Sequence, residues 1–265
     1  MDVDLRKYLQ QNHNQLTWKE RIQIADNIIN ALEIIHEENA IHRDLHSGNL
    51  LLKASRFNIS DLGFCGPADK PLKSIYGNLP YLAPEVIIGK VQTYESDIYS
   101  VAMLMWEISS GQPPFINHEH NYDLAMNIVN GIRPKIVPGT PLEYKNLMKQ
   151  CWDADPLKRP DITTLWNKIK EINLSYHIKS NESLTQPEVN NNLERKSIEN
   201  YTSNSSSLFT SKLHQFDNLP EPRNATEDIQ NDYKGETNVD DEDEIYNNPN
   251  FHSEEQNEFE LPDGN

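Results

Sequence analysis

The most informative stretch of the sequence reads His42-Arg43-Asp44-Leu45-His46-Ser47-Gly48-Asn49. Short apolar pieces flank it at residues 40–41 and 50–52, and with a third piece at 57–59 they predict small β-strands. The stretch is therefore expected to form a loop that carries the carboxylate of Asp44 and, five residues later, the amide of Asn49. A further loop is expected to begin near Asp61, twelve residues after Asn49.

Asp44, Asn49 and Asp61 form an oxygen-rich set of side chains. Such a set suits a hard cation such as Mg²⁺ better than it suits zinc. Phosphoryl transfer needs metal ions to neutralise charge and a base to orient the attacking hydroxyl, and this set supplies both roles. Phosphate chemistry is therefore the reaction class that these residues favour.

The sequence around this loop predicts a mainly helical lobe. Thr17-Trp18-Lys19-Glu20 is a capping box, and apolar residues then recur at helical spacing until Glu38. Further helices are expected at residues 97–110, 122–130, 142–152 and 162–172. The segment 63–84 contains Gly and Pro and is expected to be a loop without long regular structure. The predicted fold class is α+β, with short β-hairpins beside the helices.

Charge divides the chain near residue 175. Residues 176–265 carry 20 acidic and 6 basic side chains, so they hold most of the net charge of −17. They are rich in Asn, Ser, Glu and Asp, include an acidic run at 240–244 and show no sustained periodicity. We therefore predict one folded domain at 1–175 and a disordered acidic tail at 176–265.

Composition excludes several classes of function. An isoelectric point near 4.9 argues against binding to nucleic acid or to acidic membranes, which both require clustered Lys and Arg. The N-terminus has no secretory signal, and no apolar stretch is long enough to cross a bilayer, so we expect a cytoplasmic or nuclear protein that is not secreted. With only Cys65 and Cys151, a disulfide framework is excluded.

Three ordered motifs resemble the protein kinases: His42-Arg43-Asp44 with Asn49, Asp61-Leu62-Gly63, and Ala83-Pro84-Glu85. The resemblance extends over about residues 1–175 and is to the C-terminal lobe of a tyrosine-kinase-like or serine/threonine kinase domain. It implies a protein-kinase-like fold and the transfer of the γ-phosphate of ATP, with Mg²⁺, to Ser or Thr, or to Tyr, of protein substrates in signalling.

The resemblance also implies roles for individual residues. Asp44 resembles the base that accepts the proton of the substrate hydroxyl, and Asn49 and Asp61 resemble the Mg²⁺ ligands. Leu51 would lie beneath the adenine of ATP. Arg43 resembles the arginine that pairs with a phosphorylated residue of the activation loop.

Ser74 and Tyr76 are the candidates for that phosphorylation. Structural roles are implied for five residues: His42, Leu62, Glu85, Asp97 and Arg159. Among these, Glu85 and Arg159 resemble a buried ion pair of the family, and Asp97 resembles the helix residue that anchors the catalytic loop.

The acceptor residue type is less clearly indicated. His46 stands where serine/threonine kinases usually carry Lys, Asn78 where they usually carry Thr, and Tyr81 where many tyrosine kinases carry Trp. The ending Cys151-Trp152 with Arg159-Pro160 resembles the tyrosine kinases and tyrosine-kinase-like groups. We favour a tyrosine-kinase-like enzyme that phosphorylates Ser or Thr.

The Gly-rich phosphate loop and the strand Lys of a complete kinase domain do not occur in the sequence. The expectation is therefore that this chain alone is inactive or nearly so. Three hypotheses follow: a kinase whose sequence continues upstream of Met1, a pseudokinase-like binding module or scaffold, and a kinase completed by another polypeptide. The face normally covered by the N-terminal lobe, with Leu50, Leu51 and Leu62, is expected to be exposed and to attract a protein partner.

Overall fold

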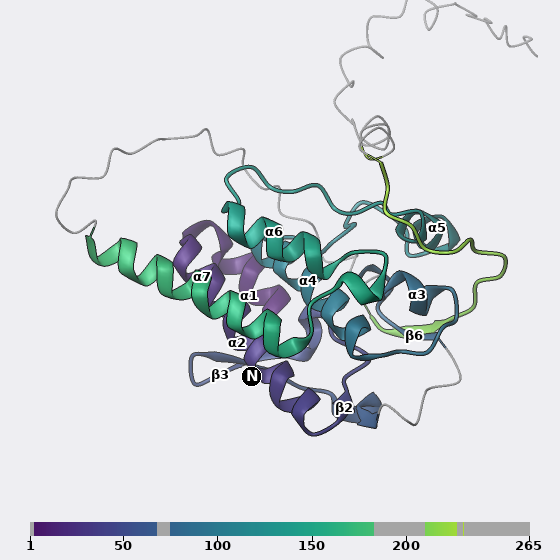
Figure 1. Ribbon diagram of the computed structural model, residues 1–265, viewed down its shortest axis with the longest axis horizontal. Coiled ribbons are helices and arrows are strands. Elements are labelled where there is room, and N and C mark those ends of the chain that lie inside the picture. The colour runs from purple at the N-terminus through teal and green to yellow at the C-terminus, as the bar shows by residue number, and fades with distance from the viewer. Residues whose placement is uncertain (1–2, 68–74, 183–209, 227–229, 231–265) are drawn as a thin grey trace, which may run out of the picture. The chain divides into compact units, whose positions relative to one another are not determined.

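The computed structural model describes residues 3–67, 75–182, 210–226 and 230 of the chain (Figure 1). The chain divides into two compact units, Met1–Ala225 and Thr226–Asn265. The first unit contains all the helices and strands named below, and of the second only Thr226 and Gln230 are described. Ser74, a predicted phosphorylation site, lies outside the described residues.

Helices form most of the first unit (Figure 1). They are α1 (Leu5–Asn12), α2 (Trp18–Glu37), α3 (Pro84–Ile87), α4 (Tyr94–Ser110), α5 (Tyr122–Val129), α6 (Leu142–Cys151) and α7 (Ile162–Glu182). The predicted helices are confirmed, although α4 begins at Tyr94 and α7 continues to Glu182. The capping box of α2 is also confirmed, since Thr17 Oγ1 accepts from the Glu20 N–H at 3.3 Å and Glu20 Oε2 accepts from the Thr17 N–H at 2.7 Å.

The strands are short and form three small sheets. They are β1 (Val3–Asp4), β2 (Ala40–Ile41), β3 (Leu50–Lys53), β4 (Arg56–Ile59), β5 (Gly66–Pro67), β6 (Ile75–Gly77) and β7 (Lys212–His214). The sheets are β1-β3-β4, β2-β5 and β6-β7, and every pairing is antiparallel. The predicted strands β2, β3 and β4 are confirmed, and the α+β fold class with them. The other four strands, of two or three residues each, were not predicted.

The core surrounds α4, which is buried along nearly its whole length and packs against α2 and α6. Helix α2 also packs against α7 and β4. Most residues of α4 between Ile98 and Ile108 are apolar, and a helix that is apolar nearly all round is buried by its neighbours, which explains its central place. None of the helices in the described ranges has the length and apolar character needed to cross a membrane.

Two expectations about burial and order require correction. Leu50 was expected on an exposed apolar face, but it is fully buried, because the β1-β3-β4 sheet packs on the helices. On the same expected face, Leu62 is 56% exposed and Leu51 is half-buried. Part of the tail expected to be disordered is also structured, since α7 ends at Glu182 and residues 210–225 form β7 and contact the lobe.

Candidate active site

Asp97 in α4 holds the backbone of the loop at residues 42–49. Its carboxylate accepts from the His42 N–H at 2.7 Å, from the Arg43 N–H at 2.9 Å and from His36 Nε2 at 3.0 Å. Arg43 has a φ of 72°, in a region that L-residues rarely adopt, so its conformation depends on such restraints. Gln92 adds one by donating from Nε2 to the Arg43 carbonyl at 3.0 Å.

The side chain of His42 is fully buried and contacts the backbone of both loops. Its Nδ1 accepts from the Asp44 N–H at 3.4 Å, so its Nε2 carries the proton and donates to the Ser60 carbonyl at 3.2 Å. The Asn49 carbonyl accepts from both the backbone N–H and the hydroxyl of Ser60, at 2.8 and 2.9 Å. The two loops that carry the candidate residues are therefore tied together through Ser60.

The carboxyl group of Asp44 lies in a nearly dry environment, and the residue is only 4% exposed. Burial raises the pKa of Asp44, and the nearby Asp61 raises it further, while the hydrogen bond from Ser211 and the closeness of His42 lower it. A buried carboxylate with a raised pKa is a stronger base than an exposed one. It is therefore suited to accept a proton from a hydroxyl group.

Asn49 and Asp61 present free oxygen atoms. Asn49 donates from Nδ2 to the Asp44 carbonyl at 2.9 Å, which leaves Oδ1 as the acceptor atom of the amide. Asp61 is exposed, and within the described ranges its carboxylate makes no hydrogen bond or ion pair. In the same part of the chain, no three His, Cys, Asp or Glu side chains gather closely enough to hold a metal by themselves. This donor set fits Mg²⁺, which is usually bound by one or two protein ligands together with the phosphates of a substrate.

Arg43 binds the segment that follows Asp61. Its guanidinium donates to the carbonyls of Phe64 at 3.1 Å and Pro67 at 2.7 Å. The ring of Tyr76 stacks on Phe64 with the centroids 3.9 Å apart. Burial raises the pKa of the Tyr76 hydroxyl, and the charges of Asp44 and Asp61 raise it further.

Glu85 and Arg159 form a bidentate ion pair with N–O distances of 2.7 and 2.8 Å. The Arg159 side chain has no exposed area, and it also donates to the carbonyls of Asp153 and Glu95. Its guanidinium lies over the ring of Tyr99, 5.2 Å from the centroid. This cluster joins the beginning of α3 to the end of the loop that precedes α7.

A buried polar network that was not predicted connects the loop to α4. The Tyr81 hydroxyl donates to Glu107 Oε2 at 2.6 Å and lies 3.2 Å from the Ser47 hydroxyl. Glu107 is 1% exposed, and burial raises its pKa. The sequence signal for this network is Glu107, the one acidic residue in the apolar run from Val101 to Ile108 of α4. A buried carboxylate needs hydrogen-bond partners, so an acidic residue in such a run indicates a polar network.

Ser211, from the region expected to be disordered, also lies at this site. Its hydroxyl is 2.6 Å from Asp44 Oδ1 and 3.1 Å from His46 Nε2. Burial, with smaller contributions from Arg6 and His42, lowers the pKa of His46 to about 3. Ser211 is 167 residues from Asp44 in the sequence, and nothing in the local pattern around it indicated this contact.

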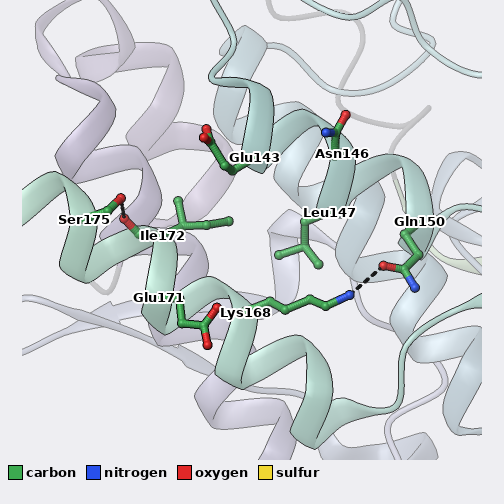
Figure 2. A pocket seen from close by; sticks show the side chains of 8 residues that line it. All are labelled: Glu143, Asn146, Leu147, Gln150, Lys168, Glu171, Ile172 and Ser175. Carbon is green, nitrogen blue, oxygen red and sulfur yellow. Dashed lines mark hydrogen bonds between the residues drawn. The ribbon is translucent and has the colours of Figure 1, made fainter.

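A separate pocket lies on the surface between α6 and α7 (Figure 2). Lys168 crosses it and donates from Nζ to Gln150 Oε1 at 2.9 Å. No candidate site residue lines this pocket, so it does not belong to the candidate active site.

The family model and the relatives that match this chain are all protein kinases. A family model described as "Protein tyrosine and serine/threonine kinase" matches residues 2–169. The chain is 31% identical over 210 residues to a dual specificity protein kinase of Dictyostelium discoideum, covering 71% of this chain and 27% of that protein. It is 38% identical over 150 residues to a human dual serine/threonine and tyrosine protein kinase, covering 55% of this chain and 16% of that protein. The corresponding protein of Apis mellifera is 35% identical over 157 residues. The chain thus spans about a quarter or less of the length of these relatives.

Proposed function

The chain belongs to the protein tyrosine and serine/threonine kinase family, and we propose that it transfers the γ-phosphate of ATP to hydroxyl groups of protein substrates, at a low rate when alone because its sequence has no Gly-rich phosphate loop or strand Lys. One observation carries the proposal. The buried carboxylate of Asp44 accepts a hydrogen bond from a serine hydroxyl at 2.6 Å, within the loop that also carries Asn49. A base within hydrogen-bond reach of an alcohol is the geometry that phosphoryl transfer to a hydroxyl requires.

In this proposal Asp44 is the base. It orients the acceptor hydroxyl and takes its proton as the oxygen bonds to phosphorus. The raised pKa of Asp44 favours this role, because it increases the affinity of the carboxylate for that proton. Its position is held by the network of Asp97 and His42 beneath the loop.

Asn49 and Asp61 are the proposed ligands of Mg²⁺, which neutralises the charge of the nucleotide phosphates when bound. The Oδ1 of Asn49 and the carboxylate of Asp61, neither of which has a hydrogen-bond partner among the described residues, support this assignment. Leu51, half-buried in β3, is the proposed contact for the adenine ring. These assignments follow from the family's use of ATP and Mg²⁺.

Arg43 is proposed to pair with a phosphate on the segment after Asp61. A phosphorylated side chain would offer charge-assisted bonds in place of the neutral Phe64 and Pro67 carbonyls that Arg43 now binds. Tyr76 and Ser74 are the proposed sites of that phosphate. Tyr76 lies close to this segment through its stacking on Phe64.

A serine or threonine hydroxyl is the acceptor that we propose first. The relatives are named as dual specificity or dual serine/threonine and tyrosine kinases, so tyrosine is the second candidate. Peptide libraries with Ser, Thr or Tyr as the only hydroxyl residue separate these acceptors when offered to the full chain with ATP and Mg²⁺.

The test of the proposal compares the wild type with Asp44→Asn. The variant keeps the shape of the side chain and removes the base, so we expect phosphate transfer to fall by about 10²-fold or more while binding of a fluorescent ATP analogue is retained. Asp123→Asn, which changes an exposed carboxylate on α5, is the matched control and should transfer phosphate at the wild-type rate. Equal transfer by Asp44→Asn and wild type would contradict the assignment. No transfer by the wild type to any acceptor would reject the kinase proposal in favour of a binding module.

A further inference from the structure

Residues 210–216, which we call the docked segment, lie along the candidate active site. Within this segment β7 pairs antiparallel with β6, and Lys212, Leu213 and His214 face Gly77, Tyr76 and Ile75. Figure 1 shows this yellow-green part of the chain running beside β6. Addition of an extended segment to an exposed strand is a common mode of peptide recognition, so β6 serves here as the receiving edge.

Ser211 is the residue of the docked segment that reaches the base. His46 Nδ1 accepts from the Gly48 N–H at 3.1 Å, and the lowered pKa of His46 keeps the ring neutral, so its proton lies on Nε2. Nε2–H therefore donates to Ser211 Oγ at 3.1 Å, and the Ser211 hydroxyl donates to Asp44 Oδ1 at 2.6 Å. The hydroxyl proton of Ser211 thus points at the carboxylate.

Contacts with β6 and α5 hold the docked segment in place. His214 donates from Nε2 to the Gly77 carbonyl at 3.0 Å and stacks on Phe216, 5.4 Å between centroids. Phe216 in turn meets the ring of Tyr122 edge-on at the beginning of α5. The placement of Ser211 therefore rests on several independent contacts besides its own hydrogen bonds.

Residues 217–225 anchor the chain beyond the docked segment. Asn224 accepts at Oδ1 from the Ala154 N–H at 2.9 Å and donates from Nδ2 to Asp153 Oδ1 at 3.0 Å. The Arg223 N–H donates to the Val129 carbonyl at 3.0 Å. Gly131 leaves the space for this approach, since a Cβ there would lie 2.1 Å from the Ala225 nitrogen.

From this geometry we propose that Ser211 is an intramolecular phosphoryl acceptor of the chain. The inference rests on the proposed kinase function and names a substrate for it. Ser211 Oγ bonds to the γ-phosphorus of ATP, the bond from that phosphorus to the oxygen bridging to the β-phosphate breaks, and ADP leaves with that electron pair. The hydroxyl proton passes to Asp44. The products are phosphoserine 211 and ADP.

The product is held less well than the substrate. A phosphoserine carries nearly two negative charges at neutral pH, and its added oxygens would occupy the place where the Ser211 hydroxyl now lies 2.6 Å from Asp44 Oδ1 and 3.1 Å from His46 Nε2. The hydrogen bond from the Ser211 hydroxyl to Asp44 is then lost, which favours departure of the docked segment from β6. Phosphorylation of Ser211 would thus open the site to other protein substrates.

The first test needs no catalysis. Hydrogen–deuterium exchange of the full chain should be slowed in the peptides that contain β6 and β7, because the amides of each strand that face the other are protected. Gly131→Ala should remove the protection, because the new Cβ would lie 2.4 Å from the Arg223 carbonyl oxygen and displace the anchor. Gly89→Ala is the matched control, since Gly89 has a φ of +86° against +92° for Gly131 and nothing lies within 4 Å of its added Cβ. Rapid exchange at 212–214 in the wild type, or equal exchange in the two variants, would overturn the proposal.

The second test follows the phosphate. The full chain is incubated with ATP and Mg²⁺ beside a Ser/Thr peptide library, and phosphate is mapped by mass spectrometry. We expect phosphoserine 211 to form with a first-order rate constant that does not depend on protein concentration. In Ser211→Ala the peptide spanning 210–216 should carry no phosphate. Library phosphorylation without phosphate on Ser211 would overturn this inference and leave the kinase function standing. No phosphate on any acceptor would overturn both.

Discussion

The imidazole of His46 should make the stability of this domain depend on pH. His46 is 7% exposed, and burial first, then Arg6 and His42, lowers its pKa from 6.5 to about 3. Between these values the unfolded state binds one more proton than the folded state. The neutral ring therefore contributes its full stability above pH 6.5, and this contribution is lost as the pH falls toward 3.

The magnitude follows from the size of that interval. One extra proton in the unfolded state changes the free energy of unfolding by about 1.4 kcal/mol per pH unit. From pH 6.5 to about pH 5, His46 should therefore reduce the free energy of unfolding by about 2 kcal/mol. His13 and His214 also have a pKa lowered by burial, so the wild-type curve contains their contributions as well.

His46→Asn isolates the contribution of this ring. Asn cannot titrate, and its side-chain oxygen can accept from the Gly48 N–H in place of Nδ1. We expect the fall in the free energy of unfolding between about pH 7 and about pH 5, measured by urea titration, to be smaller by about 2 kcal/mol in the variant. Nitrogen NMR of the wild-type ring should show the Nε2–H tautomer throughout this range. The same pH dependence in both proteins, or a His46 midpoint near 6.5, would refute the reasoning.

Three further predictions concern buried or capping groups. Glu85→Ala leaves the guanidinium of Arg159 buried without its carboxylate and should cost about 3–5 kcal/mol in chemical unfolding, and a loss below 1 kcal/mol would contradict the structural role of the pair. Tyr81→Phe removes the 2.6 Å donor to Glu107 and should destabilise the fold by about 1–3 kcal/mol, so an unchanged melting temperature would count against the network. Thr17→Ala removes the cap of α2 and should cost about 1 kcal/mol. The pKa of Glu20 is lowered first by the Thr17 backbone N–H, which Ala keeps, and then by the Thr17 hydroxyl, which Ala removes. The part of the cost due to the hydroxyl should therefore shrink in urea titrations as the pH falls below 4.5, and a constant cost would show that its contact with Glu20 is not part of it.

Much of the candidate site could be recognised in the sequence because its parts are local. Asp44 and Asn49 lie on one short loop, and Asp61 follows the hairpin of β3 and β4, so the order and spacing of the three residues identify them in the sequence. The structure gives these residues their environment. The raised pKa of Asp44 depends on what covers it, and the restraint of Arg43 by Asp97 links residues 54 apart. Such contacts leave no mark on local spacing.

The sequence by itself determined the helices α2 and α4 to α7, the strands β2 to β4 and the loop motifs, because capping residues and apolar periodicity act over a few neighbouring positions. Only the tertiary structure decided that Leu50 is buried, that Tyr81 meets Glu107 and that Ser211 reaches Asp44. For Ser211 the physical reason is that residues 210–225 are mostly polar and have no periodic apolar face of their own. Its order in 210–225 comes from an edge strand and a set of hydrogen-bond partners that exist only after the rest of the lobe has folded.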